Sequence, residues 1–84
     1  MRYRVELEVM PRAGLADPQG RAVEGALPAL GWANVSDVRV GKLIRLTVDA
    51  PDAGTARRQV EEMAARFLSN PVIEDARVLE ADPA

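Results

Sequence analysis

The 84-residue chain contains no cysteine and no histidine. These two absences exclude disulfide bonds, thiolate metal sites and imidazole metal ligands. The only aliphatic hydroxyls are those of Ser36, Thr47, Thr55 and Ser69. The chain has no histidine that could activate one of them as a nucleophile, and it has no cysteine nucleophile. No Walker-type glycine loop is present either. We therefore expect no catalytic, cofactor-binding or metal-ligating residue in this chain.

Aromatic residues are equally scarce, because Tyr3, Trp32 and Phe67 are the only three and lie far apart. The 11 basic and 13 acidic residues are interspersed and give a formal charge of −2. A nucleic-acid-binding surface normally combines stacking aromatics with a basic patch, so nucleic acid is not an expected partner. No apolar run approaches the roughly 20 residues that span a bilayer, and the first residues alternate charged with apolar side chains. These features predict a cytoplasmic protein without a membrane partner.

The length predicts one domain over residues 1–84. A domain of this size buries only about 60% of the surface of its unfolded chain, which leaves a thin stability margin. Since disulfides and cysteine or histidine metal sites are excluded, self-association into a homodimer or tetramer is the expected reinforcement.

The apolar pattern predicts two helices and four strands. Period-two alternation marks a strand around residues 3–9, and Asp17-Pro18 has the form of an N-cap followed by proline at N1. Asp52 is the second expected N-cap, and Asn70-Pro71 ends that helix. The expected elements are a strand over 3–9, a helix from Pro18 to Gly31, strands 35–40 and 43–50 joined by a Gly41-Lys42 hairpin, a helix over 53–69, and a strand over 72–79. The order β-α-β-β-α-β predicts an α+β, ferredoxin-like fold, with an antiparallel sheet and two helices on one face.

Two local features qualify this arrangement. The apolar stripe that runs from Ala22 to Leu30 should lie on the sheet, but Pro28 should kink or fray the helix before Gly31. The last strand carries apolar residues on both parities, which predicts a cover on both of its faces. In so small a chain the second cover would come from another subunit, so we expect dimerisation through the sheet and the last strand.

Four groups of polar residues are candidate sites. The Asp17–Gly20 helix start suits capping better than phosphate binding, because Asp17 is negative and Pro18 lacks a donor. Glu6 and Glu8 share a face with arginines and fit a charge ladder better than an acid/base pair. Lys42, the only lysine, is more readily a turn residue than a phosphate ligand. Glu74 and Asp75 are adjacent on a strand, so they point apart and are poorly placed to chelate one cation.

Three strings, read together, add a resemblance. They are Asp17-Pro18-x-Gly20-x-Ala22-Val23, Val38-Arg39-x-Gly41-Lys42 and Asn70-Pro71-Val72-Ile73-Glu74-Asp75. Their order and spacing, with Gly31 closing the first helix, resemble the PurS subunit family of phosphoribosylformylglycinamidine (FGAM) synthase over nearly the whole chain. The sequence departs from that pattern at Arg12, Pro28 and Ala76.

The resemblance implies a small, non-catalytic, structural subunit of a ligase complex in purine biosynthesis. Its implied partners are a PurL-type synthetase subunit, a PurQ-type glutaminase subunit and a second copy of itself. ATP with Mg and glutamine would be used by the partner subunits, and this chain would bridge them and assist ammonia transfer. The residues implied to shape its interfaces are Asp17, Gly20, Arg39, Gly41, Lys42, Asn70, Glu74 and Asp75. The alternative is a stand-alone ferredoxin-like regulatory module that binds a small metabolite at a dimer interface.

Overall fold

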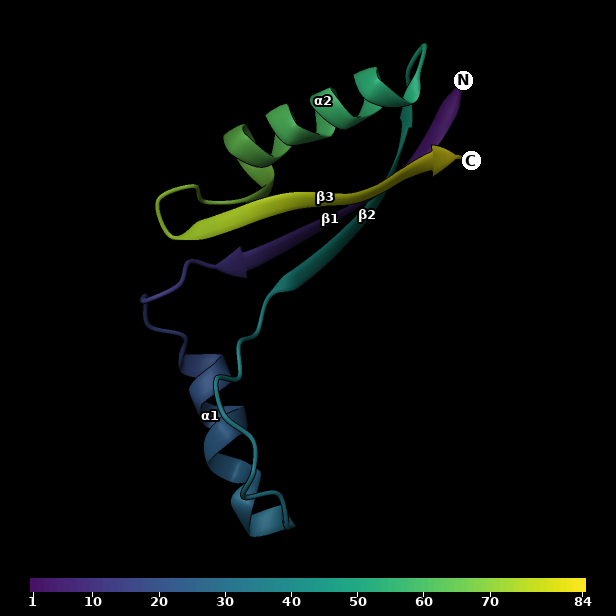
Figure 1. Cartoon of the computed structure of the whole chain (residues 1–84). Coiled ribbons are helices and arrows are strands. Elements are labelled where there is room, and N and C mark those ends of the chain that lie inside the picture. Colours follow the sequence, from purple (N-terminus) through teal and green to yellow (C-terminus); the bar gives the residue numbers. More distant parts are fainter.

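The computed structural model describes residues 1–84, and it divides into a sheet with one helix and a projecting arm. The strands are β1 (Arg2–Pro11), β2 (Lys42–Asp49) and β3 (Glu74–Pro83). The helices are α1 (Pro18–Ala26), the 3₁₀ turn η1 (Pro28–Leu30), α2 (Ala53–Met63) and the π turn η2 (Ala64–Leu68). The sheet is antiparallel with the order β2-β1-β3, and the molecule measures 51 × 26 × 14 Å (Figure 1). Neither α1 nor α2 is long and apolar enough to cross a lipid bilayer.

The core lies between the sheet and α2. The central strand β1 turns Tyr3, Val5, Leu7 and Val9 toward this helix, and all four are buried. The helix supplies small side chains at helical spacing, and the outer strands supply Val48 and Val78. Only 11 of 84 residues are buried, so the hydrophobic core that stabilises the isolated chain is small.

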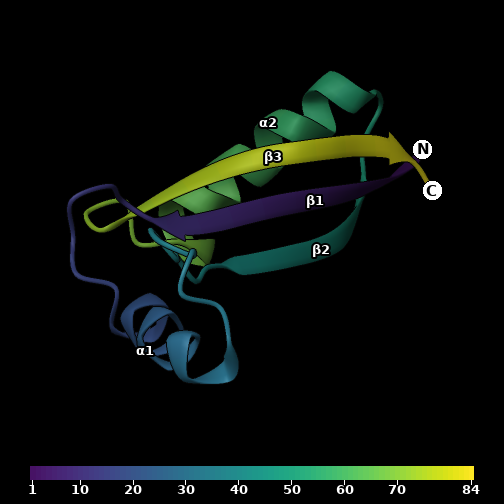
Figure 2. The same ribbon diagram turned by 60° about the horizontal axis from the view of Figure 1, so that its bottom comes forward.

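The opposite face of the sheet is covered by no helix (Figure 2). The side chains on this face are charged. Arg45 Nε lies 3.0 Å from Glu6 Oε1, and Arg77 Nη2 lies 3.6 Å from Glu8 Oε1. These are cross-strand pairs, because Glu6 is opposite Arg45 on β2 and Glu8 is opposite Arg77 on β3. The predicted charge ladder is therefore present, and Glu6 and Glu8 each have a basic partner.

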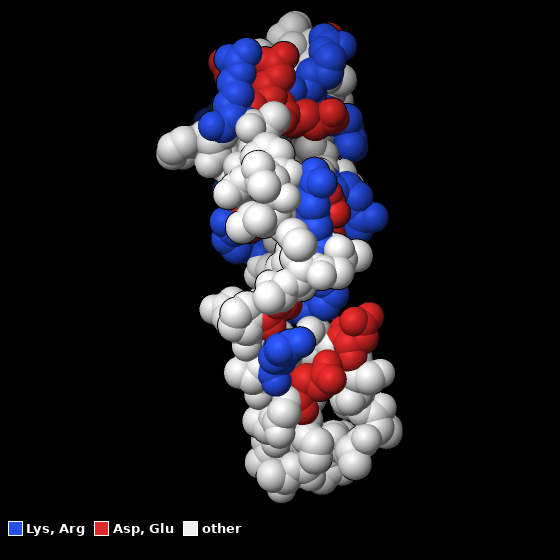
Figure 3. All heavy atoms as spheres, turned by 90° about the vertical axis from the view of Figure 1, so that its left-hand side faces the viewer, with Lys and Arg blue, Asp and Glu red and all other residues white.

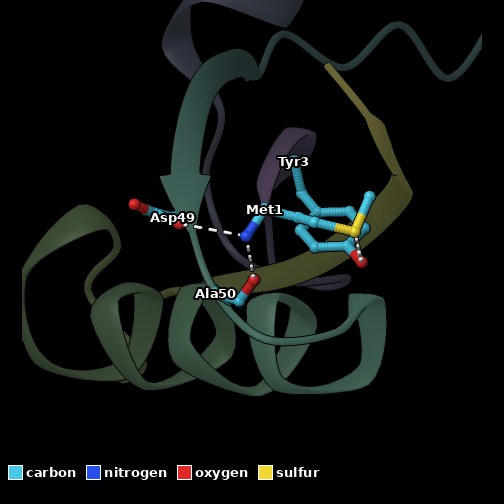
Figure 4. Close-up of polar contacts among 4 residues, drawn as sticks. All are labelled: Met1, Tyr3, Asp49 and Ala50. Atoms are coloured by element: carbon cyan, nitrogen blue, oxygen red, sulfur yellow. Dashed lines mark hydrogen bonds and ion pairs between the residues drawn. The ribbon is translucent and has the colours of Figure 1, made fainter.

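The end of the sheet remote from the arm is closed by the N-terminus (Figure 4). The Met1 ammonium lies 3.3 Å from Asp49 Oδ1 and donates to the Ala50 carbonyl at 3.1 Å. The Tyr3 hydroxyl lies 3.7 Å from Met1 Sδ. These contacts join the start of β1 to the connection between β2 and α2.

The predicted α+β class with an antiparallel sheet and two helices is confirmed, but the strand predicted over 35–40 is absent. The Gly41-Lys42 hairpin is absent too, since β2 pairs with β1 and Gly41 has no positive φ. The physical reason is that the amides of Val38 and Val40 donate to the carboxylates of Glu24 and Asp17 at 2.9 Å. These side chains take the hydrogen bonds that a neighbouring strand would otherwise accept.

The α1 helix does not lie on the sheet, which is the second departure from the expected arrangement (Figures 1 and 2). It projects from the end of the sheet, and Val23 and Leu30 of its apolar stripe are 45% and 67% exposed. The predicted effect of Pro28 is confirmed, because α1 ends at Ala26, a single 3₁₀ turn follows, and Gly31 closes it at φ 105°.

The mixed parity of the last strand has a local explanation. The register of β3 against β1 shifts by one residue, so that Leu7 is opposite Val78 but Glu6 is opposite Glu80. The extra residue, Leu79, forms a β-bulge, and beyond it Ala81 rather than Glu80 faces α2 with Val78. The bulge thus accounts for part of the apolar pattern on both parities, and the cover expected from another subunit stays a prediction.

Candidate interaction site at the arm junction

The arm consists of residues 12–41, which leave the end of β1, form α1 and η1, and return to the start of β2 (Figure 1). Its base meets the turn before β3, and we call this region the junction. The structure brings to the junction or the base of the arm all eight residues that the sequence motifs singled out. They are Asp17, Gly20, Arg39, Gly41, Lys42, Asn70, Glu74 and Asp75.

Asp17 connects the two halves of the arm. Its Oδ1 accepts the Gly20 amide at 3.0 Å as the N-cap of α1, and its Oδ2 accepts the Val40 amide at 2.9 Å. These two donors, Gly20 first, lower the pKa of the Asp17 carboxyl from its ordinary value of 3.8, and the nearby Arg39 charge acts in the same direction. The capping role predicted for Asp17 is therefore present, with a second bond that the sequence did not indicate.

Glu24 repeats this bond two turns further along α1. Its Oε1 accepts the Val38 amide at 2.9 Å, so the returning segment is held at alternate residues by two carboxylates of one helix face. Sequence reasoning did not single out Glu24. The available signal was its position seven residues after Asp17, which places both side chains on the same face of a helix.

Two glycines allow close backbone approach at the base of the arm. A Cβ on Gly20 would overlap the Val38 carbonyl oxygen and Asp17 Oδ2, and a Cβ on Gly41 would overlap Met10 Sδ and the Val9 carbonyl oxygen. Neither glycine has a positive φ. Both positions therefore need glycine for space and not for backbone conformation.

The turn before β3 forms the other side of the junction. Glu74 Oε1 accepts the Asn70 amide at 2.7 Å, and Asn70 Oδ1 accepts the Val72 amide at 3.1 Å. Glu74 Oε2 lies 3.9 Å from Lys42 Nζ, which links this turn to β2. Asn70 has no positive φ, so it shapes the turn and does not form the left-handed helix cap that was predicted.

Arg12 connects the beginning of the arm to the same turn. Its Nε lies 3.5 Å from Asp75 Oδ1, and its backbone amide donates to the Ile73 carbonyl at 2.9 Å. Glu74 and Asp75 thus have different basic partners, Lys42 and Arg12, and do not converge on one point. No group of three or more metal-capable side chains gathers in the structure.

A groove of about 560 Å³ runs through the junction. It is lined by the first part of the arm, from Leu15 to Gln19, and by Val40, Gly41 and Ile73 among others. Leu15 and Ile73 are 47% and 49% exposed, so this groove is apolar surface left open in the isolated chain.

The far end of the arm is also apolar. Residues 25–36 contain no charged side chain, and Figure 3 shows the corresponding end of the molecule as an uncharged surface. Trp32 is 54% exposed there, and Leu30 and Val35 are exposed as well. An exposed aromatic within an uncharged segment is typical of a surface that contacts another protein.

The fold and the junction together define a class of small α+β protein. In this class, carboxylates hold a projecting arm in place, and apolar surface is exposed along that arm. The family comparison agrees with the motif resemblance. Residues 4–81 match the family model PurS, phosphoribosylformylglycinamidine (FGAM) synthase. The chain belongs to the PurS family.

Sequence similarity to individual PurS subunits supports this membership. The subunit PurS of phosphoribosylformylglycinamidine synthase from Synechocystis is 44% identical over 73 residues, which cover 87% of this chain and 73% of that protein. The Bacillus subtilis subunit PurS is 40% identical over 75 residues, which cover 89% of this chain and 88% of that protein.

Solved structures show the same architecture. Thermus thermophilus PurS superposes with a TM-score of 0.87 at 37% identity, covering 100% of this chain and 99% of that one. A chain from the structure of PurLQS from Thermotoga maritima superposes with a TM-score of 0.85 at 29% identity, covering 93% and 95%. The projecting arm thus belongs to an architecture that solved PurS structures share.

Proposed function

We propose that this chain is the small structural subunit of an FGAM synthase complex, in which it bridges a PurQ-type glutaminase and a PurL-type synthetase. The match to a chain of Thermotoga maritima PurLQS over nearly its whole length carries the proposal. The glutaminase releases ammonia from glutamine, and the synthetase uses ATP and captures that ammonia. By holding the two active sites in register, the small subunit limits the loss of ammonia to water.

The shape of the chain supports a bridging role. The molecule is 51 Å long and exposes apolar side chains in two places. One is the end of the arm around Trp32, and the other is η2 with the following turn, where Phe67 and Val72 are 85% and 78% exposed. Two separate apolar surfaces allow one contact with a second copy of this chain and another with a partner subunit, and a dimer presents the second surface twice.

A second copy of this chain is the occupant we propose for the arm. The nine residues of α1 are too few for a helix that is stable in water without packing, and the stripe of α1 is uncovered. Trp32 is the only tryptophan, so its fluorescence reports directly on burial of the arm. Dilution should shift its emission to longer wavelength together with the loss of dimer in sedimentation equilibrium, and Trp32→Ser should weaken the dimer. A wild-type chain that sediments as a monomer at all concentrations would contradict self-association.

Reconstitution tests the bridging role. The glutaminase and synthetase subunits from the same organism are combined with the wild-type chain, with Phe67→Ser or with no small subunit, and the conversion of formylglycinamide ribonucleotide is measured. We expect the glutamine-dependent rate to fall without the chain and with Phe67→Ser, while the rate with added ammonia is unchanged. Glu80→Gln, on the charged sheet face, is the control. Full glutamine-dependent activity in the absence of the chain would overturn the proposal.

A further inference from the structure

One arginine at the base of the arm lacks a hydrogen-bond acceptor. The Nη2 atom of Arg39 is buried and has no partner in the chain. A guanidinium group presents five N–H donors, and a buried donor without an acceptor is costly. Arg39 forms no ion pair, whereas Glu74 and Asp75 at the junction are paired with Lys42 and Arg12.

Arg39 lines a cavity of about 430 Å³ between the two halves of the arm. Arg21, from the first turns of α1, lies in the same lining and also forms no ion pair. The connection from β1 closes the cavity at Ala13 and Gly14, whose backbone amides donate to no acceptor of the chain. Residues with unused donors, from three segments of the chain, thus line one cavity.

We propose that this cavity binds an oxyanion, a carboxylate or phosphate group, with Arg39 as its principal ligand and Arg21 as the second. On binding, the planar guanidinium of Arg39 would turn its buried Nη2–H toward the cavity and donate it to one oxygen of the anion, which supplies the missing acceptor. The proposal concerns this cavity alone and does not depend on the bridging role.

Two carboxylates in the same lining make the cavity electrically neutral overall. Glu24 and Asp37 balance the charges of Arg21 and Arg39, and one oxygen of Glu24 is engaged by the Val38 amide. Long-range attraction of anions is therefore weak, and binding rests on short hydrogen bonds from the guanidinium groups. Such binding should persist at 0.15 M salt, at which the Debye length is about 8 Å.

The oxyanion has two possible sources, a free small molecule or a carboxylate of a second copy of this chain. For the first source, the ¹⁵N-labelled protein is titrated with inorganic phosphate and, separately, with succinate at constant ionic strength, and the arginine Nε–Hε signals are followed. Saturable shifts at Arg39 are expected, with the dissociation constant raised about tenfold or more in Arg39→Gln. Arg66→Gln, which removes an arginine of η2, should leave it unchanged.

For the second source, sedimentation equilibrium compares the wild type with Arg39→Gln and Arg66→Gln. A dimer weakened only by Arg39→Gln, with no saturable anion binding, assigns the oxyanion to the second copy. Saturable binding that Arg39→Gln abolishes assigns it to a free anion. If Arg39→Gln does not fold, Arg21→Gln and Arg39→Lys replace it, since Arg21 is exposed and lysine keeps the charge without the planar fork. Neither saturable binding nor a change in the dimer, in variants with wild-type circular dichroism, would overturn the proposal.

Discussion

Asp17 accepts the backbone amide of Val40 at 2.9 Å, across 23 positions of the chain. The same carboxylate caps α1 through the Gly20 amide, so one side chain holds the first turn of the helix and the returning segment together. This bond, with the parallel one from Glu24, gives the arm its hairpin form without a strand ladder. The arm therefore depends on a few side chains, whereas the sheet depends on a core.

Loss of the Asp17 carboxylate should loosen the arm and leave the sheet intact. We expect Asp17→Ala to raise the hydrogen-exchange rates of the Gly20 and Val40 amides, because both lose their acceptor, with little change in β1. Asp52→Ala is the matched control, since Asp52 caps α2 through the Thr55 amide at 2.7 Å. It should raise exchange in the first turn of α2 and spare the arm. Equal protection at Val40 in Asp17→Ala and wild type would refute this role.

The stabilisation from Asp17 should decrease in acid. The amides of Gly20 and Val40 keep the pKa of Asp17 in the folded chain below its ordinary value of 3.8. A carboxyl with a lowered folded pKa stabilises fully above its unfolded pKa and loses that contribution as the pH falls through the folded pKa.

Urea unfolding between about pH 6 and pH 2 should therefore show that wild type exceeds Asp17→Asn in stability at the upper end, with the difference shrinking below about pH 4. Asp82→Asn is the control, because Asp82 forms no side-chain hydrogen bond or ion pair and its substitution should give a difference that is small at every pH. A constant difference for Asp17→Asn would contradict the argument.

Alanine should be tolerated at one glycine of α1 and not at another. Gly20→Ala introduces a methyl group that overlaps the Val38 carbonyl, and we expect a loss of about 1–3 kcal/mol in the free energy of unfolding. Gly25 has nothing within 4 Å of the added Cβ, so Gly25→Ala should stabilise the helix by about 0.5–1 kcal/mol. Gly41→Ala should resemble Gly20→Ala, because Met10 and Val9 occupy the space. Thermal melts of the three variants give the order, and a stable Gly20→Ala would show that the returning segment does not lie against α1.

The thin core should make single truncations severe. Leu7 is 1% exposed at the centre of β1, and Leu7→Ala should cost about 2–5 kcal/mol. Total stabilities of natural domains are about 5–15 kcal/mol, and a chain this small lies toward the lower end, so this variant should be largely or wholly unfolded. Leu43→Ala, at a site that is 50% exposed on β2, should change stability much less. Similar losses for both leucines in denaturant unfolding would show that the core lies elsewhere.

The elements with strong local signals were predictable from the sequence. Alternation predicted β1 and β2, and the caps at Asp17 and Asp52 predicted the starts of both helices. The predicted break at Pro28 is present because proline removes a helical donor wherever the helix packs. The sequence motifs singled out the eight residues together, but they did not indicate that these residues lie at the junction or the base of the arm.

The prediction failed where one local pattern is compatible with two different tertiary structures. Residues 35–40 have β-forming side chains, but their amides bond to Glu24 and Asp17, and no pattern of apolar residues indicates a carboxylate on another element. Nor did the sequence indicate the bulge at Leu79, which changes the parity of β3 that faces α2, because a bulge is decided by pairing with β1.

The sequence by itself determined the three strands of the sheet, the starts of both helices, the absence of cysteine and histidine chemistry, and the motifs that identify the PurS family. Only the tertiary structure decided that α1 leaves the sheet, that the eight motif residues meet at or near the base of one arm, and that Arg39 has a donor without an acceptor. The physical reason is the sequence separation over which each kind of interaction acts. Capping, periodicity and proline act within a turn or two of the chain, whereas the position of the arm depends on hydrogen bonds and close contacts between residues far apart in sequence.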